Sequence, residues 1–473
     1  MPPRYRQVAS DIAAHIEQGR LTSGDKLPGV RQASSRYKVS MSTALAAYRY
    51  LEQEQYIEAR PRSGFYIKAR FETAIPRPRE SRPNSTPALV NNQQRVMQVI
   101  TAANQPGILR LGATVPDASF LPVAALERAL ASAARHPHSR GNGYEFPPGY
   151  LGLRQQLANR MNKLGCPLHA DDITITQGCQ EALYLALKVS CKAGDIVALE
   201  SPLFYGLLQI IDSLGLQALE IPTDPQQGIS LAALQLAIEK WPVAACIVVT
   251  NFSNPIGASL NDERKRELVA MLRAAAIPLI EDDIYGELSF EGQRPGIAKR
   301  YDKSGDVLYC SSLSKSLSPG LRIGWIAGGK YREELNYQKF TLNAAGATIP
   351  QLAAERLLQS GEYDRHLHRM RAALATSTAR IREALARHMP SGTQITQPRG
   401  GYALWLELPK QVDTLLLAEQ ALAKHISIAA GPLFTASEKY RHCLRISCAC
   451  PWNLQLEQGL ATLGELARAQ CSN

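Results

Sequence analysis

Seven polar side chains that can bind or react with a small molecule stand just after apolar, strand-like runs of the sequence. They comprise an amide, a carboxylate, a phenol, two hydroxyls, an amine and a guanidinium: Asn254, Asp282, Tyr285, Ser312, Ser314, Lys315 and Arg322. Each alone has an ordinary explanation, such as a helix cap for Asp282, a surface amine for Lys315 or an ion pair for Arg322. Their grouping at successive strand ends predicts a shared site.

Together these side chains match the needs of pyridoxal 5′-phosphate. A lysine amine forms a Schiff base with the cofactor, and a carboxylate keeps the pyridine nitrogen protonated so that the ring withdraws electrons. An amide and a phenol bind the ring hydroxyl, while hydroxyls and an arginine bind the phosphate dianion. The turn Gly178-Cys179-Gln180 opens a predicted helix and offers free backbone N–H groups to the same phosphate.

The elements that would position these side chains alternate between strand and helix. Apolar runs predict strands at 173–176, 196–199, 245–250, 278–281, 307–310 and 323–327, and periodic runs predict helices such as 231–240 and 261–276. This alternation is typical of an α/β fold with a mostly parallel sheet covered on both faces. Ligands of such sheets collect at the carboxyl ends of the strands.

This region resembles the fold-type I aminotransferases, the aspartate aminotransferase superfamily, over about residues 108–465. The resemblance implies that Lys315 forms the Schiff base and that Asp282 pairs with the ring nitrogen. It implies that Tyr285 and Asn254 bind the ring hydroxyl. For the phosphate it implies the side chains or backbone amides of Ser312, Ser314, Arg322, Gly178, Cys179 and Gln180.

Two further residues are implied to act at the edges of that site. Tyr144, in Tyr144-Glu-Phe-Pro-Pro-Gly149, matches the residue that reaches a phosphate across the dimer interface. Arg445, in Cys443-Leu-Arg-Ile-Ser447, matches the arginine that binds the α-carboxylate of a substrate or effector.

Two positions depart from the family pattern without removing an essential group. Phe204 stands where the family stacks a tyrosine on the ring, so stacking is kept and a hydroxyl is lost unless Tyr205 supplies it. Cys179 stands in the phosphate loop, where hydroxyl-bearing or small residues are common. The resemblance still implies a pyridoxal phosphate site.

The first 70 residues show a different pattern. Apolar residues at helical spacing predict helices over about 5–18 and 29–37, and a third helix after the turn at 39–43, with Ser40 or Ser42 as its N-cap. Leu45, Tyr48 and Leu51 share one face of that helix. Strands are predicted at 56–60 and 64–67. Three helices and a hairpin predict a winged helix-turn-helix whose third helix enters the major groove of DNA.

This module resembles the GntR-type DNA-binding domain over about residues 4–68. The resemblance rests on Gly24-Asp-Lys-Leu-Pro28, Arg31, Val39-Ser40, Thr43, Leu51, Tyr56-Ile57 and Ser63-Gly-Phe-Tyr66. The DNA contacts that it implies are Arg31, Ser40, Ser42, Thr43 and, in the wing, Arg62 and Gly64. Discrimination between bases needs a side chain that reaches the base edges, such as Arg49 or Ser42. Met41 departs from the family, which commonly has an arginine there.

A proline-rich stretch separates the two patterns. Residues 71–90 contain prolines and no apolar periodicity, which is typical of a tether. We therefore expect a DNA-binding domain at 1–70, a linker at 71–104 and an aminotransferase-like domain at 105–473. Such a tether lets the module lie over its own large domain or over that of a partner.

Composition and charge agree with this division. A chain of 473 residues exceeds one hydrophobic core, and 45% hydrophobic with 20% charged residues is the mix of a globular protein. Residues 1–90 hold 15 Lys and Arg against 8 Asp and Glu, which is most of the net charge of +11 and favours a polyanionic partner.

The sequence shows no pattern typical of membrane insertion, secretion or metal binding. We find no apolar run long enough to span a bilayer and no signal peptide. The nine cysteines lack metal spacing and favour a reduced, cytoplasmic protein. The histidine pairs 136/138 and 366/368 lack a third ligand, so we expect solvated side chains there and no metal.

A GntR-like winged helix joined to an aminotransferase-like domain resembles the MocR subfamily of bacterial transcription regulators over nearly the whole chain. The resemblance implies a head-to-tail homodimer that binds double-stranded DNA and senses pyridoxal 5′-phosphate, or an amine or amino-acid effector. The alternative is an active aminotransferase that carries a DNA-binding module, since Lys315, Asp282 and Arg445 are all present. A scaffold without cofactor is disfavoured because every cofactor contact survives.

Overall fold

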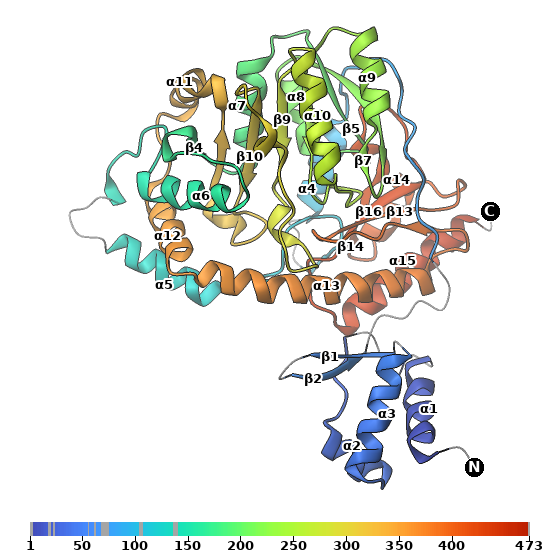
Figure 1. Ribbon diagram of the computed structural model, residues 1–473. Helices are drawn as coiled ribbons and strands as arrows, with labels where there is room; N and C mark the ends of the chain where they lie inside the picture. The colour runs from blue at the N-terminus through green and yellow to red at the C-terminus, as the bar shows by residue number, and fades with distance from the viewer. Residues whose placement is uncertain are drawn as a thin grey trace.

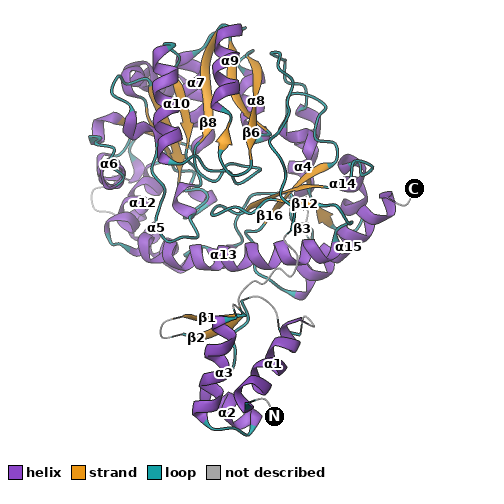
Figure 2. Ribbon diagram, turned by 45° about the vertical axis from the view of Figure 1, so that its right-hand side comes forward, coloured by secondary structure: helices purple, strands orange, loops and turns teal. Residues whose placement is uncertain are grey.

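The structure, a computed structural model, consists of a small N-terminal module and a large α/β domain (Figure 1). It describes residues 3–17, 20–21, 24–54, 56–60, 63–67, 75–103, 107–135 and 141–471. In both ribbon views the module lies beneath the long helix α13 at the base of the large domain (Figures 1 and 2).

The N-terminal module has the predicted three helices and hairpin. These elements are α1 (Arg4–Glu17), α2 (Val30–Tyr37), α3 (Met41–Gln53), β1 (Ile57–Arg60) and β2 (Gly64–Ile67), with β1 and β2 antiparallel. Ser40 caps α3, because its Oγ accepts a hydrogen bond of 3.1 Å from the Thr43 N–H. Leu45 is only half-buried, since the core face of α3 is instead formed by Ala44, Ala47, Tyr48 and Leu51.

The described part of the linker lies along the large domain. Ala88 exchanges two backbone hydrogen bonds of 2.9 Å with Ala218 of β6 (Gln217–Asp224), and the Thr223 N–H donates to Ser81 Oγ at 2.8 Å. Prolines keep the segment extended, and the N–H groups of Ser81 and Ala88 pair with carbonyls of β6. The sequence predicted a tether over 71–90, whereas from residue 75 onward the segment is docked. A helix, α4 (Gln93–Ala103), follows.

The large domain is built on one eight-stranded sheet in the order β4-β11-β10-β9-β8-β5-β6-β7. The pairs from β10 to β6 are parallel, and β11 is antiparallel to both of its neighbours. The mostly parallel sheet was predicted. Its strands besides β6 are β4 (Ile173–Thr176), β5 (Ile196–Ser201), β7 (Gly228–Ile229), β8 (Val243–Val249), β9 (Leu279–Asp282), β10 (Val307–Ser312) and β11 (Gly324–Ala327).

Helices cover both faces of this sheet (Figure 2). On β5, Val197 and Leu199 pack on the side of α7 and α8, while Ile196 and Ala198 pack on the side of α9 and α10. This alternation buries every residue of the strand, which is why its first four residues, 196–199, form a continuous apolar run. The helices of this part of the chain are α5 (Val123–Ala134), which packs on α12, and α6 (Leu151–Lys163), α7 (Cys179–Ser190), α8 (Tyr205–Ser213), α9 (Leu231–Lys240), α10 (Asp262–Ala274) and α11 (Arg332–Asn343).

A second, antiparallel sheet and long helices complete the domain. The sheet has the order β12-β13-β16-β15, and a short parallel pair joins β14 to β3. These strands are β3 (Leu109–Arg110), β12 (Gln394–Ile395), β13 (Ala403–Glu407), β14 (Ile426–Ser427), β15 (Ala429–Ala430) and β16 (Cys443–Ser447). The helices are α12 (Thr348–Gln359), α13 (Glu362–His388), α14 (Thr414–Leu422) and α15 (Leu454–Cys471).

One histidine differs from its prediction. We expected a solvated His366, but it is buried, and its Nε2–H donates to Ser316 O at 2.8 Å, because this face of α13 packs against the large domain. His368 is exposed, and the 136/138 pair lies outside the described residues. Across the described residues no group of three potential ligands is placed to hold a metal, and no helix is long and apolar enough to cross a membrane.

Candidate cofactor-binding site

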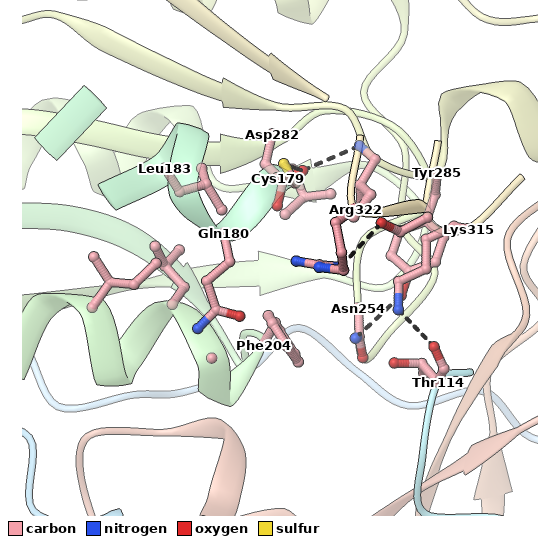
Figure 3. A pocket seen from close by; sticks show the side chains of 16 residues that line it. Thr114, Cys179, Gln180, Leu183, Phe204, Asn254, Asp282, Tyr285, Lys315 and Arg322 are labelled. Atoms are coloured by element: carbon pink, nitrogen blue, oxygen red, sulfur yellow. Dashed lines mark hydrogen bonds between the residues drawn. The ribbon is translucent and has the colours of Figure 1, made fainter. Parts of the chain in front are cut away.

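A cavity of about 130 Å³ opens at the carboxyl ends of the parallel strands (Figure 3). It brings together most of the predicted polar residues: Cys179, Gln180, Asn254, Asp282, Tyr285, Ser314, Lys315 and Arg322. Phe204 lines it as well. The apolar part of the wall was not predicted and consists of Leu183, Leu207, Ile210, Val249 and Ile284.

Lys315 follows β10 and points its amine across the cavity. Its Nζ donates a hydrogen bond of 2.6 Å to the backbone carbonyl of Thr114, which comes from the other side of the site (Figure 3). Burial, together with the positive charge of Arg445, lowers the pKa of Lys315 to about 8. A larger fraction of the amine is therefore neutral near pH 7, which is the nucleophilic form.

Asp282 is the last residue of β9 and is 7% exposed. Its Oδ1 accepts hydrogen bonds from the Ile284 N–H at 3.1 Å and from the Cys179 thiol at 3.5 Å. Burial raises the pKa of Asp282 to about 6, and both hydrogen bonds oppose that rise. The carboxylate is therefore mostly ionised at neutral pH and offers a negative charge in a dry setting.

Asn254, Tyr285 and Arg445 form a connected row beside the amine. The amide of Asn254 donates to Tyr285 Oη at 3.4 Å and its Oδ1 accepts from Arg445 Nη1 at 3.2 Å. Arg445 is fully buried on β16, and its Nη2 donates to the carbonyl of Gly112. Its Nε has no partner among the described residues. A buried guanidinium with an unused donor is ready to bind an anion.

Aromatic rings hold that guanidinium in place. Its central carbon lies 5.1 Å from the ring centre of Phe434 and 6.0 Å from that of Tyr205. Phe204 points into the cavity, whereas Tyr205 packs on Phe434 at 5.7 Å. Tyr205, the residue after Phe204, therefore contacts the guanidinium of Arg445 and helps to fix its position.

The opposite end of the cavity is an anion cradle. Gly178 has φ +85°, and a Cβ there would come 2.5 Å from Arg322 Nη2, so only glycine allows this approach. Arg322 Nη2 donates to Gln177 O at 2.8 Å, and α7 begins at Cys179 with free N–H groups. The guanidinium of Arg322, the neighbouring hydroxyl of Ser314 and the free N–H groups of α7 are the kinds of group that bind a phosphate.

Three predicted cofactor residues do not line the cavity of this chain: Gly178, which lies behind Arg322, and Ser312 and Tyr144. Ser312 is 3% exposed, and its Oγ lies 2.7 Å from Ser314 Oγ and 3.0 Å from Ile323 O, so its direct contact is with Ser314. Tyr144 is 81% exposed and stacks on Phe146 at 5.5 Å.

Comparison with known proteins covers both parts of the chain. Residues 108–463 match the family "Aminotransferase class I and II", and residues 4–67 match "Bacterial regulatory proteins, gntR family". The HTH-type transcriptional regulator YjiR of Escherichia coli (strain K12) is 40% identical over 466 residues, which cover 98% of each chain. The chain belongs to the MocR subfamily of GntR-type regulators. A second MocR relative from the same organism, YdcR, is 37% identical over 98% of each chain.

A solved structure bears on the cofactor. LysN, the α-aminoadipate aminotransferase of Thermus thermophilus, has a TM-score of 0.73 and 25% identity, over 81% of the MocR chain and all of LysN. It was solved with N-(5′-phosphopyridoxyl)-L-leucine. The residues of the MocR cavity fit the phosphopyridoxyl group, since the amine of Lys315 and the buried carboxylate of Asp282 face one space whose end is the cradle at Gly178. The cofactor of this site is pyridoxal 5′-phosphate.

Thr114 was missed by sequence reasoning. Its carbonyl accepts from Lys315 Nζ and, at 3.3 Å, from Tyr402 Oη. It follows β3, a strand of two residues that is too short to show a periodic pattern. The apolar wall was missed because its side chains, from α7, α8, β8 and the segment after β9, read as ordinary core.

Most of the predicted DNA-contact residues are exposed on the MocR module. Arg31, Ser40, Ser42, Arg49 and Gly64 are exposed, and Thr43 is half-buried. Ser40 Oγ also lies 2.8 Å from Ser42 Oγ and from Thr43 Oγ1, so these hydroxyls form one cluster at the start of α3. Arg62 lies outside the described residues.

Proposed function

We propose that this MocR protein is a transcription regulator that binds double-stranded DNA through residues 1–70 and senses a small molecule in its large domain. The sensed molecule is pyridoxal 5′-phosphate itself, or an amine or amino acid. The observation that carries the proposal is the pairing of Lys315 and Asp282 in one cavity, with Arg445 joined to its wall through Asn254, in a chain that also has a basic winged helix.

The predicted cofactor residues of the cavity have definite tasks in this proposal. The neutral amine of Lys315 holds the cofactor carbonyl, and Asp282 holds the proton of the ring nitrogen. Asn254 and Tyr285 bind the ring hydroxyl, and Phe204 stacks on the ring. The phosphate is held by Arg322, Ser314 and the amides of 178–180, while Ser312 fixes Ser314. The cofactor supplies a carbonyl that condenses with amines and a ring that withdraws electrons.

An effector with an α-carboxylate would bind Arg445. This guanidinium has an unused Nε–H, and its Nη1 already points at Asn254 in the cavity wall. Asn254, the partner of Arg445 Nη1, lines the same cavity as Lys315. A carboxylate bound to Arg445 would therefore place the amine of an amino acid beside Lys315.

We propose a homodimer, and we place it in the cytoplasm because its partner is DNA. Three large aromatic residues are exposed together on the large domain: Tyr144, Phe146 and Phe340 are 81%, 53% and 52% exposed. Phe146 lies 6.4 Å from Phe340 and 5.5 Å from Tyr144. Exposed apolar patches of this kind mark interfaces. From such an interface Tyr144 would reach the partner's phosphate.

An active aminotransferase is the second candidate. It is favoured by Lys315, Asp282 and Arg445, which are the groups that transamination needs. A regulator responds to a ligand through its DNA affinity, whereas an enzyme must cycle with a 2-oxo acid. Sustained conversion of an amino acid and a 2-oxo acid, with DNA affinity unchanged by any ligand, would favour the enzyme.

Borohydride trapping tests the cofactor site on which the proposal depends. The protein is incubated with pyridoxal 5′-phosphate, reduced with borohydride and mapped by mass spectrometry. We expect the label on Lys315 and none in Lys315→Ala. The control Lys330→Ala removes a lysine that pairs with Asp306 on the surface, and it should keep the label. A Lys315→Ala protein that is still labelled in the cavity would refute the assignment.

A further inference from the structure

The first turn of α7 carries a carboxylate that holds the chain segment before the helix. Glu181 Oε2 accepts a hydrogen bond of 2.5 Å from the Gln177 N–H. The carbonyl of Gln177 accepts a hydrogen bond of 2.8 Å from Arg322 Nη2. Both backbone groups of Gln177 are thus engaged, one by Glu181 and one by the arginine of the anion cradle. Together they fix the orientation of the peptide that leads into Gly178.

Gly178 needs such support because glycine has more conformational freedom than any other residue type. Its φ of +85° is one of many conformations open to it. The free N–H groups at the start of α7 follow directly, so their direction depends on this turn. A turn that is fixed before a ligand arrives loses less conformational entropy on binding. Fixing Gln177 therefore favours binding of a phosphate at the cradle.

Helix α11, which lies beside α7 in Figure 1, holds Glu181 in turn. Lys339 Nζ donates to Glu181 Oε2 at 3.0 Å and to Asn343 Oδ1 at 3.2 Å. The side-chain amide of Asn343 donates to Glu181 Oε1. Both carboxylate oxygens of Glu181 are therefore engaged. The side chains of Glu181 and Lys339 are 9% and 2% exposed, so the ion pair is shielded from water.

The burial of Lys339 is not explained by the packing of α11. Tyr337, Phe340 and Leu342 of the same helix are 50–62% exposed, although their side chains are more apolar than that of a lysine. Burying an ammonium costs free energy, and a buried ion pair often stabilises a fold no more than apolar residues of similar size would. The pair therefore points to a task beyond joining two helices.

That task follows from the charge at this end of α7. A helix N-terminus attracts a phosphate dianion, whereas an unbalanced carboxylate in its first turn would repel the dianion. Lys339 balances the charge of Glu181. The carboxylate can therefore hold the Gln177 N–H without opposing a phosphate at the cradle.

We propose that Glu181 is a positioning residue for the cofactor phosphate, and that Lys339 and Asn343 keep it in that role. Neither Glu181 nor Lys339 lines the cavity. Glu181 acts through Gln177 on the anion cradle. The inference rests on the proposed function for the place of the phosphate. It adds the residues that set how much the phosphate group, as distinct from the ring, contributes to binding.

Two ligands separate this role from general damage to the fold. Pyridoxal 5′-phosphate and pyridoxal differ only in the phosphate group, so the ratio of their affinities isolates the phosphate contribution. Absorbance titrations of the full chain at pH 7 give both affinities. A loss of packing in the cavity would weaken both ligands, whereas a misplaced cradle weakens only the phosphorylated one.

Two double variants remove the ion pair in different ways. Glu181→Met with Lys339→Met also removes the acceptor for the Gln177 N–H, so the ratio should fall about tenfold or more, as expected for a hydrogen bond to a charged group. Glu181→Gln with Lys339→Met keeps an acceptor at this place without an unbalanced charge, and its ratio should stay within about threefold of the native one. Equal ratios in the two double variants, or an equal loss of both affinities, would overturn the positioning role.

Thr174→Val is the matched control. It removes the hydrogen bond of 2.8 Å between Thr174 Oγ1 and Asn336 Oδ1, which also joins α11 to the sheet, and it should leave the ratio unchanged. A ratio that falls as far in this control as in the methionine variant would overturn the role of Glu181. A native protein that binds both ligands equally well would instead refute the phosphate site of the proposed function.

A single substitution covers the case in which the double variants fail to fold. Asn343→Leu removes the donor to Glu181 Oε1 and leaves the ion pair with Lys339 in place. It should lower the ratio about threefold, since one hydrogen bond that holds the carboxylate is lost. A thermal melt without ligand checks that the variant folds. A folded Asn343→Leu protein with the native ratio would overturn the proposal.

Discussion

The thiol of Cys179 donates a hydrogen bond of 3.5 Å to Oδ1 of Asp282 (Figure 3). The bond joins the first residue of α7 to the last residue of β9, at the point where the cofactor ring nitrogen would meet the carboxylate. Both side chains are buried, and burial raises the pKa of the Cys179 thiol well above its usual value, so it stays protonated and remains a donor. Cys179 therefore helps to keep Asp282 ionised.

Replacing this thiol tests its role. Cys179→Ala removes a donor to the carboxylate, which should weaken binding of pyridoxal 5′-phosphate by roughly two- to tenfold, the worth of one hydrogen bond of about 0.5–1.5 kcal/mol. Cys179→Ser keeps a donor at this position and should bind nearly as the native protein does. Absorbance titrations at pH 7 give both affinities. Equal affinities for the alanine and serine variants would show that the bond does not matter.

Capture of the cofactor should depend on pH between about 6 and 8. Lys315, with its pKa lowered to about 8, gains roughly tenfold more neutral amine for each pH unit as pH rises toward 8. Asp282, with its pKa raised to about 6, becomes protonated below that pH and no longer balances the ring nitrogen. The capture rate should therefore rise from pH 6 to 8 and level off, while retention of bound cofactor should fall below pH 6.

Stopped-flow absorbance measures this profile. The reaction of pyridoxal 5′-phosphate with a simple alkylamine under the same conditions corrects for the ionisation of the cofactor itself. A corrected midpoint near 10, the ordinary value for lysine, would contradict the influence of burial and of Arg445 on the amine.

DNA affinity should come from the N-terminal module. Arg31→Ala should cost about 1–3 kcal/mol if the guanidinium makes a charged contact with DNA. Affinity should fall steeply with salt, because phosphate contacts release counterions. Arg128→Ala, an exposed arginine of α5, is the control and should bind as the native protein does. Fluorescence anisotropy at several salt concentrations checks this, and a flat salt dependence would argue against the module as the DNA-binding part.

The exposed aromatic patch should hold the dimer together. Phe340→Glu places a charge in the patch of Tyr144, Phe146 and Phe340, and it should shift the protein toward monomers in sedimentation velocity. Leu236→Glu changes another exposed apolar residue, on α9, and should leave the dimer intact. If both variants sediment as the native protein does, the interface lies elsewhere.

The central sheet and its polar strand ends were predictable because each signal is local. Continuous apolar runs mark strands that are buried on both faces, as residues 196–199 of β5 show. Polar residues just after such runs mark the edge of the sheet at which ligands bind. Asp282, Tyr285 and Lys315 could therefore be found from their neighbours in sequence. Ser40 was found as a helix cap for the same reason.

Contacts between distant segments carried no such signal. Thr114 meets Lys315 across 201 positions through its backbone carbonyl, which any residue type could provide. The burial of His366 depends on which face of α13 meets the large domain, and the docking of residues 81 and 88 depends on a free sheet edge. Ser312 shows the limit of a motif, since the motif implies a contact with the phosphate while the hydroxyl in this chain contacts Ser314.

The central claim is that a ligand in the large domain changes how tightly the chain holds DNA. The direct measurement is an affinity titration of the native protein against duplexes that tile its own upstream region, with and without pyridoxal 5′-phosphate and a panel of amino acids. We expect at least one ligand to change the affinity about five- to 150-fold, and we expect Arg445→Lys to blunt the response to amino acids while affinity without ligand stays nearly the same. If no ligand moves the isotherm while a 2-oxo acid supports sustained turnover, the protein is an enzyme and the sensing account is wrong.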